Sequence, residues 1–327
     1  MKISSKLIVA SVAFGCSLAV NAQENSSEPK GKAIVQVFGN FHSGFGETDD
    51  DRGFSLDRSY LGYEYKLDGS LSVKGVMDIG KSSDVSDYQR LAYIKNAMVS
   101  WKKDGLTFNG GLISTTQFNF QEKFWGYRYI MKSFQDEYKF GSSADLGISA
   151  AYKFADWISA DAIIVNGEGY KKIQVGNGLN YGLGLTLTPL KGINIRLYGG
   201  VNETVVDSLK NTANLAAFAG YKNERFAVGA EYNYMQNASF IDGRDQSGFS
   251  VYASVNLLDD IAIYARYDDL ASKDDWNLSK DEQAAILGAQ FKLGKYVKIA
   301  PNFRMAIPKA DGADSQYSAY VSCYFGL

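Results

Sequence analysis

The chain has 327 residues with 34 Lys and Arg, 36 Asp and Glu and one His, and its formal charge at pH 7 is −2. This balance argues against a nucleic-acid partner, because nucleic-acid-binding surfaces carry a clustered basic excess. One histidine and two cysteines exclude a His/Cys metal site and a disulfide framework. With 22 tyrosines, 33 glycines and only 4 prolines, the composition favours an all-β protein with short turns.

The first 22 residues have the features of a secretory signal. Lys2 and Lys6 precede an apolar run over residues 7–20, and small residues lead to Ala22. This pattern predicts a signal peptide that is cleaved after Ala22. Cys16 leaves open a lipoprotein cleavage before that cysteine, for which the preceding residues are a poor match. No later apolar run reaches the length of a membrane helix.

Beyond a polar leader at residues 23–32, strand-like alternation runs through residues 33–327. Val35 and Val37, for example, share one face of the first stretch, and Gln36 falls on the other. A period of two predicts strands with unlike faces. The predicted strands run for about ten to thirteen residues, which is long enough to span hydrocarbon when tilted.

Tight turns and longer polar segments alternate along this region. The tight turns fall at residues 68–69, 103–105, 155–156, 189–192, 222–224, 259–260 and 294–295. The longer segments fall near residues 46–53, 80–91, 117–144, 167–177, 203–211, 237–247, 270–281 and 309–315. Seven turns and eight loops separate sixteen strands, and such strands can meet lipid only in a closed barrel. The sequence therefore predicts a transmembrane antiparallel up-and-down β-barrel, with a soluble β-sandwich or β-helix as the alternative.

Aromatic residues recur near the strand ends, as the two interfacial girdles of a membrane barrel require. They include Trp101, Trp157, Tyr181, Tyr221, Phe226, Tyr296 and Tyr317.

The third long loop, residues 117–144, is the longest segment without alternation. Its nine aromatic residues make disorder improbable, and a loop of this length is usually functional. We expect it to fold into the lumen and narrow it, the alternative being an aromatic lid or a short packed helix outside the barrel. The candidate constriction residues are Glu122, Lys123, Trp125, Arg128, Lys132, Asp136, Glu137 and Lys139.

Five basic residues fall near mid-height on the predicted inward face: Arg58, Lys74, Arg196, Arg266 and Arg304. Because the first strand of a closed barrel pairs with the last, four of them, all except Arg196, fall on one arc of the wall. Clustered charges of this kind set pore selectivity. The alternative is that each basic residue is a lumen side chain with an acidic partner nearby.

Acidic residues gather in the loops at the predicted outer mouth. They are Glu47, Asp49, Asp50, Asp51, Asp84, Asp87, Asp242, Asp245, Asp274, Asp275, Asp281 and Glu282. Such loops could bind divalent cations that bridge surface lipids, although solvated surface charge is the default reading. An enzymatic barrel would need a histidine with Ser or Asp partners, and His42 is the only histidine.

The layout resembles that of the sixteen-stranded general porins. The strings KGKAIVQVFGNFHSGFG, DRSYLGYEY, FWGYRYIMKSFQDEYKFGSSADLG and NGEGYKKIQ are similar to outer-membrane porins of Bacteroidetes, often grouped with the phosphate-selective porins O and P. One departure is the C-terminal residue, Leu327, where outer-membrane barrels commonly end in an aromatic residue.

The resemblance implies a homotrimer in the bacterial outer membrane that lets small hydrophilic solutes or ions diffuse through it. It implies membrane lipids and surface lipopolysaccharide as neighbours, and neither catalysis nor a cofactor. A solute-specific porin for anions, phosphate or oligosaccharides is the alternative, followed by a surface adhesin or an outer-membrane enzyme.

Overall fold

The computed structural model describes residues 30–327 except 49, 83–84, 87–88 and 173–175. The predicted signal peptide, residues 1–22, and all of the leader up to residue 29 lie outside the described residues. The first strand begins at Gly31, two residues before the predicted start of the barrel.

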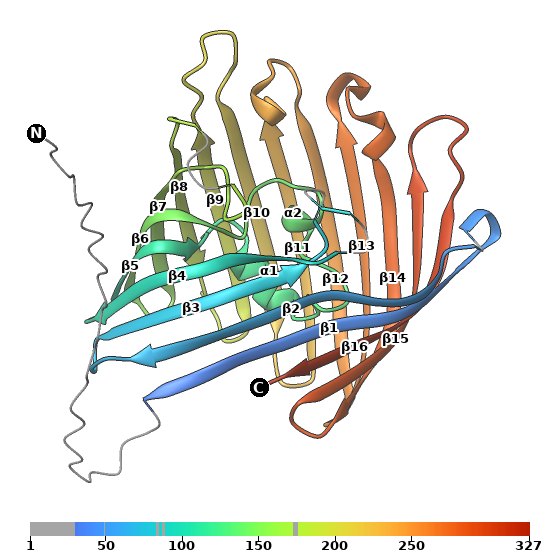
Figure 1. The fold of residues 1–327 in the computed structure, drawn as a ribbon, viewed down its shortest axis with the longest axis horizontal. Helices are drawn as coiled ribbons and strands as arrows, with labels where there is room; N and C mark the ends of the chain where they lie inside the picture. Colours follow the sequence, from blue (N-terminus) through green and yellow to red (C-terminus); the bar gives the residue numbers. More distant parts are fainter. Residues whose placement is uncertain (1–29, 49, 83–84, 87–88, 173–175) are drawn as a thin grey trace, which may run out of the picture.

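The described chain forms sixteen strands in one closed barrel, as the sequence predicts (Figure 1). Their bounds are β1 Gly31–Phe45, β2 Arg52–Lys66, β3 Leu71–Gly80, β4 Leu91–Lys103, β5 Leu106–Ser114, β6 Ala144–Ala155, β7 Ile158–Val165, β8 Asn180–Leu187, β9 Ile193–Asn202, β10 Thr212–Lys222, β11 Phe226–Gln236, β12 Gln246–Leu258, β13 Ile261–Ser272, β14 Glu282–Leu293, β15 Val297–Pro308 and β16 Gln316–Gly326. Each strand is antiparallel to its neighbours in the chain. The ring closes where β1 pairs with β16, in a register that sets Gln36 opposite Gly326.

The tight turns are fixed by local hydrogen bonds. Between β2 and β3, the carboxylate of Asp68 accepts the backbone N–H groups of Ser70 and Leu71, both at 2.7 Å. These two bonds hold the pKa of the Asp68 carboxyl below its ordinary value. Because such a turn is too short for a crossover connection, the two strands that it joins pair antiparallel.

Each strand presents two unlike faces. On β11 the apolar Val228 and Tyr232 are 47% and 53% exposed, whereas Glu231 and Asn233 are buried. We call the first the outer face and the second the inner face. Trp101 and Trp157, two of the predicted girdle residues, are also exposed. Apolar residues outside and polar residues inside reverse the pattern of a water-soluble barrel and match that of a membrane-spanning one.

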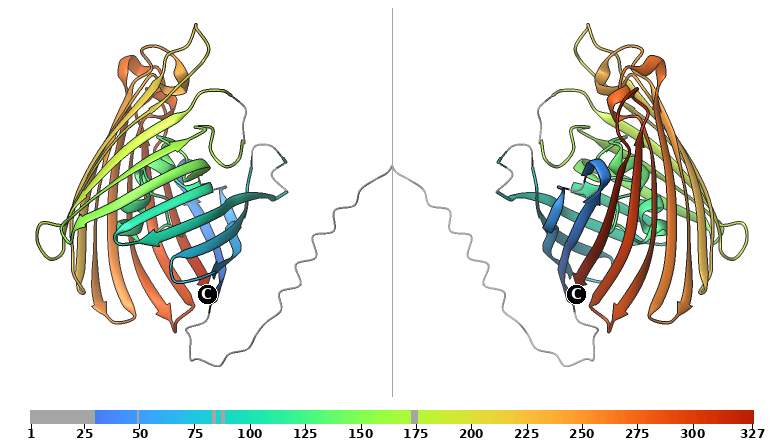
Figure 2. Two further views of the ribbon diagram at one scale, coloured as in Figure 1. Left: turned by 90° about the vertical axis from the view of Figure 1, so that its left-hand side faces the viewer. Right: turned by 90° about the vertical axis from the view of Figure 1, so that its right-hand side faces the viewer.

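The third long loop runs from residue 115 to residue 143, close to its predicted bounds. It contains two short helices, α1 Asn119–Trp125 and α2 Phe134–Glu137. Gly126 ends α1 in the left-handed conformation, with φ of 76°, and donates its N–H to the carbonyl of Glu122. In Figures 1 and 2 both helices lie between the front and back strands of the barrel.

Four 3₁₀ turns lie in three other loops of the described chain, two of them in the loop between β13 and β14: η1 Gly46–Thr48, η2 Ala238–Phe240, η3 Lys273–Asp275 and η4 Leu278–Lys280. Among the described residues, none of the helices combines the length and apolar character needed to cross a membrane.

Candidate functional site

Aromatic rings attach the third long loop to the inner face of strands β10, β12 and β13. The ring pairs are Phe124–Phe218, Trp125–Tyr252 and Tyr127–Tyr264, with centroids 4.8, 5.1 and 4.6 Å apart. Such pairs contribute on the order of 0.5–1.5 kcal/mol each beyond their burial. The loop aromatics therefore form a packed core against the wall.

A glycine on the wall makes room for this core. Phe134 of α2 lies against Gly248 on β12, where an added Cβ would lie 2.4 Å from the ring. A larger residue at this position could not coexist with the observed packing.

Three wall arginines donate hydrogen bonds to backbone carbonyls of the loop. Arg196 on β9 binds the carbonyl of Thr116 at 2.6 Å, and Arg266 on β13 binds that of Lys132 at 2.6 Å. Arg304 on β15 binds the carbonyl of Ile130 at 2.8 Å. Hydrogen bonds from charged donors contribute about 1.5–3 kcal/mol. These arginines thus anchor the loop at three places on the wall.

For Arg196 and Arg266 the structure shows the alternative, a wall arginine with an acidic partner. They are 3% and 4% exposed. Arg196 binds both carboxylate oxygens of Asp161, at 2.6 and 3.1 Å, and Arg266 binds both of Asp268, at 2.8 and 2.6 Å. A buried guanidinium needs such a partner because desolvation of an unpaired charge is costly. Their charges are compensated locally.

Lys74 lies on the expected arc of the wall, on β3 beside β2. It lies on β3 opposite Glu64 in the β2–β3 register and is partly buried. It does not line the cavity described next.

A cavity of about 620 Å³ separates the tip of the third long loop from the wall. We call it the central cavity. Arg128, Lys132 and Glu137 line it from the loop side, and Arg58 and Arg304 line it from strands β2 and β15. Two of the predicted wall residues therefore do meet at one cavity. Its charged lining has both signs: Arg58, Lys81, Arg128, Lys132 and Arg304 with Asp51, Asp57, Glu137 and Glu282.

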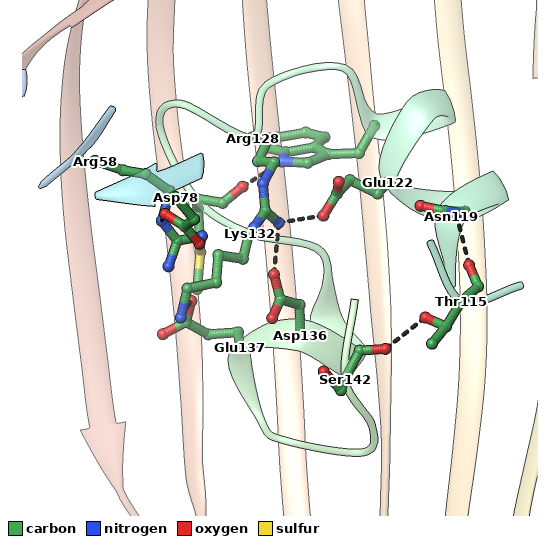
Figure 3. A network of polar contacts seen from close by, with 12 residues as sticks. Arg58, Asp78, Thr115, Asn119, Glu122, Arg128, Lys132, Asp136, Glu137 and Ser142 are labelled. Carbon is green, nitrogen blue, oxygen red and sulfur yellow. Dashed lines mark hydrogen bonds and ion pairs between the residues drawn. The ribbon is translucent and has the colours of Figure 1, made fainter. Parts of the chain in front are cut away.

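The loop brings its own charged residues together in one network (Figure 3). Nη1 of Arg128 forms ion pairs with Glu122 and Asp136, and Nη2 donates to the hydroxyl of Tyr60 on β2 at 3.2 Å. Lys132 pairs with Glu137 at 3.6 Å. Burial raises the pKa of the Asp136 carboxyl, but Arg128, Lys132 and Lys95 together lower it more, so the net pKa lies below the ordinary value.

The remaining predicted loop residues lie apart from this network. Trp125 is buried and donates its indole N–H to the carbonyl of Met131 at 2.9 Å. Lys123 and Lys139 are exposed.

Arg304 differs from the other wall arginines because its partners are neutral. Nε donates to Oδ1 of Asn302 at 2.9 Å, and the guanidinium lies 3.8 Å from the ring centroid of Tyr320. An arginine held by amide, carbonyl and aromatic groups keeps its full charge at the cavity.

His42, the candidate catalytic histidine, is held by polar neighbours. Its Nδ1 lies 2.8 Å from Oδ1 of Asn40, its Nε2 lies 3.3 Å from Oδ1 of Asp51, and its ring stacks on Tyr320. Both ring nitrogens are therefore engaged, and neither faces a nucleophile.

The carboxylates that pair with the wall arginines are site residues that the sequence analysis missed: Asp78, Asp161 and Asp268. Alternation alone places Asp161 and Asp268 on the inner face, so a signal was present. The pairing of Asp161 with Arg196 depends on strand register, which the sequence pattern does not supply, whereas Asp268 pairs with Arg266 two residues away on the same strand.

No protein-family model matches this chain, and no curated protein matches it. Solved structures do match. OprB of Pseudomonas putida superposes with a TM-score of 0.74 at 12% identity, over 91% of this chain and 94% of that one. The anion-selective porin of Comamonas acidovorans gives 0.70 at 13% identity, over 91% and 99%. Salmonella typhi OmpF, in complex with daunomycin, gives 0.67 at 11% identity, over 91% and 97%. At these identities the likeness shows the fold alone, and that fold is the closed sixteen-stranded barrel of the porins.

Proposed function

We propose that this protein is a porin of a bacterial outer membrane, through which small hydrophilic solutes and ions diffuse passively. A sixteen-stranded barrel is too wide for side chains to fill and leaves a water-filled lumen. The apolar outer face supports contact with lipid, and the polar inner face supports contact with water. Membrane lipids and surface lipopolysaccharide are then its neighbours.

The third long loop is proposed to narrow this lumen to the central cavity. The observation that carries the proposal is the set of strands that the loop touches at once. Arg128 contacts Tyr60 on β2, Arg196 contacts Thr116 from β9, and Arg304 contacts Ile130 from β15. Strands β2, β9 and β15 lie at separate places around the closed barrel. One loop can contact all three at once if it crosses the interior of the barrel.

The charges at the central cavity favour a weak preference for anions. Arg304 has neutral partners, whereas Arg58, Arg128 and Lys132 each have a carboxylate partner. Arg304 therefore supplies basic charge at the narrowest section, where few waters screen it, but Asp57 and Glu282 line the same cavity with neutral partners of their own, so the proposed preference is weak.

The packing does not favour stacking of sugar rings on the loop aromatics, the basis of the oligosaccharide alternative. Phe118, Trp125, Phe134 and Phe140 are 0–3% exposed, so they hold the loop and do not face a solute. With both nitrogens of His42 engaged, an enzymatic barrel is not favoured either. The proposed assembly is a homotrimer, to be tested by cross-linking in mild detergent.

The experiment is conductance of the purified full chain in a planar lipid bilayer. The proposal predicts stepwise, ohmic currents carried by several kinds of ion. A protein that inserts and conducts nothing would contradict it and leave an adhesin or a closed barrel as the better reading.

A further inference from the structure

The fourth long loop, which joins β7 to β8, also touches a distant part of the wall. The structure describes its residues 166–172 and 176–179. The hydroxyl of Tyr170 donates to Oδ2 of Asp78 on β3 at 2.5 Å. Three strands, β4, β5 and β6, lie between β3 and β7 in the barrel. The loop therefore crosses from β7 past β6, β5 and β4 to reach β3.

Backbone hydrogen bonds hold Tyr170 and the two glycines before it in place. Oδ2 of Asp145 on β6 accepts the N–H groups of Gly167 and Gly169, at 2.8 and 3.1 Å. Both glycines have positive φ, 97° and 81°, a conformation that other residues rarely adopt. The N–H of Tyr170 then donates to the carbonyl of Ala144 at 2.9 Å, and its side chain is 7% exposed. Its hydroxyl is consequently held in place at Asp78.

Asp78 connects this hydroxyl to the central cavity. The carboxylate is 2% exposed, and its second oxygen, Oδ1, lies 3.2 Å from Nε of Arg58. Nη1 of Arg58 donates to the hydroxyl of Tyr60 at 3.1 Å, and Arg58 lines the cavity. Gly80 lies opposite Arg58 in the β2–β3 register.

From this chain of contacts we infer that Tyr170 is a positioning residue that sets the orientation of Arg58 at the constriction, and thereby the ion preference of the pore. The inference rests on the proposed pore function. A carboxylate and a guanidinium favour pairing through two parallel bonds. The Tyr170 hydroxyl binds Oδ2 and holds the carboxylate so that Asp78 meets Arg58 through Oδ1. The terminal nitrogens of Arg58 therefore point toward Tyr60 and the central cavity.

Removing the hydroxyl frees Oδ2 to accept a terminal nitrogen of Arg58. The guanidinium then turns from the cavity toward β3, and part of the basic field at the constriction is lost. Tyr170→Phe keeps the ring and its packing, so it changes this one bond.

The test measures the reversal potential across a KCl gradient for the full chain in planar bilayers. Tyr170→Phe should shift the potential toward potassium preference, in the direction of Arg58→Gln and by less. In an Arg58→Gln or Asp78→Asn background the same substitution should produce no further shift. If Tyr170 had only a structural role, Tyr170→Phe would shift the reversal potential equally in the native protein, in Arg58→Gln and in Asp78→Asn.

Tyr234→Phe is the matched control, because its hydroxyl binds Oδ2 of Asp245 at 3.0 Å away from the central cavity. It should leave the potential unchanged. An unshifted potential in Tyr170→Phe, or a shift that persists without Arg58, overturns the inference while the pore remains. Absence of any current from the native protein overturns the pore proposal itself, and the inference with it.

Discussion

Nη2 of Arg304, on strand β15, donates a hydrogen bond of 2.8 Å to the carbonyl oxygen of Ile130 at the tip of the third long loop. The same guanidinium lies over Tyr320 and forms no ion pair with the described residues. One residue therefore both holds the loop and supplies charge to the cavity. These two roles can be separated by substitution.

Ion preference should depend on the two arginines that line the central cavity. The acidic mouth is screened within about 8 Å at physiological salt and within less at higher salt, so at high salt the narrow section dominates and the native pore should weakly prefer anions. Arg58→Ala combined with Arg304→Ala should move the reversal potential toward cations. At low salt the native pore should also drift toward cations as the mouth gains influence.

Two controls sharpen this measurement. Arg225→Ala removes an equal charge from an exposed turn away from the cavity and should change nothing. Arg304→Lys keeps the charge but not the forked donor, so it should preserve the preference while making the current noisier as the loop loosens. Strong cation preference at high salt in the native protein, unaffected by the double substitution, would refute the basic assignment.

Stability should depend on the pair of Arg196 and Asp161. Arg196→Ala leaves a partly buried carboxylate without its partner, and removing one member of a buried pair costs about 3–5 kcal/mol. The double variant Arg196→Ala with Asp161→Ala should recover part of this loss. The measurement is the urea midpoint of the purified barrel in detergent micelles. Equal destabilisation in the single and double variants would show that the pairing itself is unimportant.

The loop network should weaken in strong acid. The folded-state pKa of Asp136 lies below its ordinary value of 3.8, so its contribution to stability is complete above that pH. It is lost as the pH falls through the lowered pKa. Single-channel recordings should therefore show a steady current at neutral pH and added flicker below about pH 3.8. Asp136→Asn should flicker at neutral pH and respond less to acid; an identical acid response in this variant would exclude Asp136 as the titrating group.

The barrel could be predicted from the sequence because its signals are local. Period-two alternation and turn residues identify strands one at a time, and closure follows from the need to pair every edge. The strand count, the two faces and the bounds of the third long loop were all available in this way.

The partner of Arg196 could not be predicted, because the pairing depends on strand register and on space left by a residue of another strand. Arg196 reaches Asp161 by crossing β8 over Gly184, where an added Cβ would lie 2.3 Å from Nη2. Nothing near Arg196 in the sequence points to a glycine on the neighbouring strand. Arg266, by contrast, pairs with Asp268 two residues away on its own strand. Alternation reveals which face a residue occupies and leaves its neighbours across the sheet undetermined.

The central claim is that the third long loop narrows a conducting lumen, and single-channel conductance of a loop deletion tests it most directly. Residues 120–138 would be removed from the full chain, and closure of the barrel checked by its resistance to unfolding in cold detergent. The account predicts a larger conductance than that of the native protein, with a weaker ion preference. A folded deletion variant with native conductance would contradict it, because the loop would then lie outside the path of the ions.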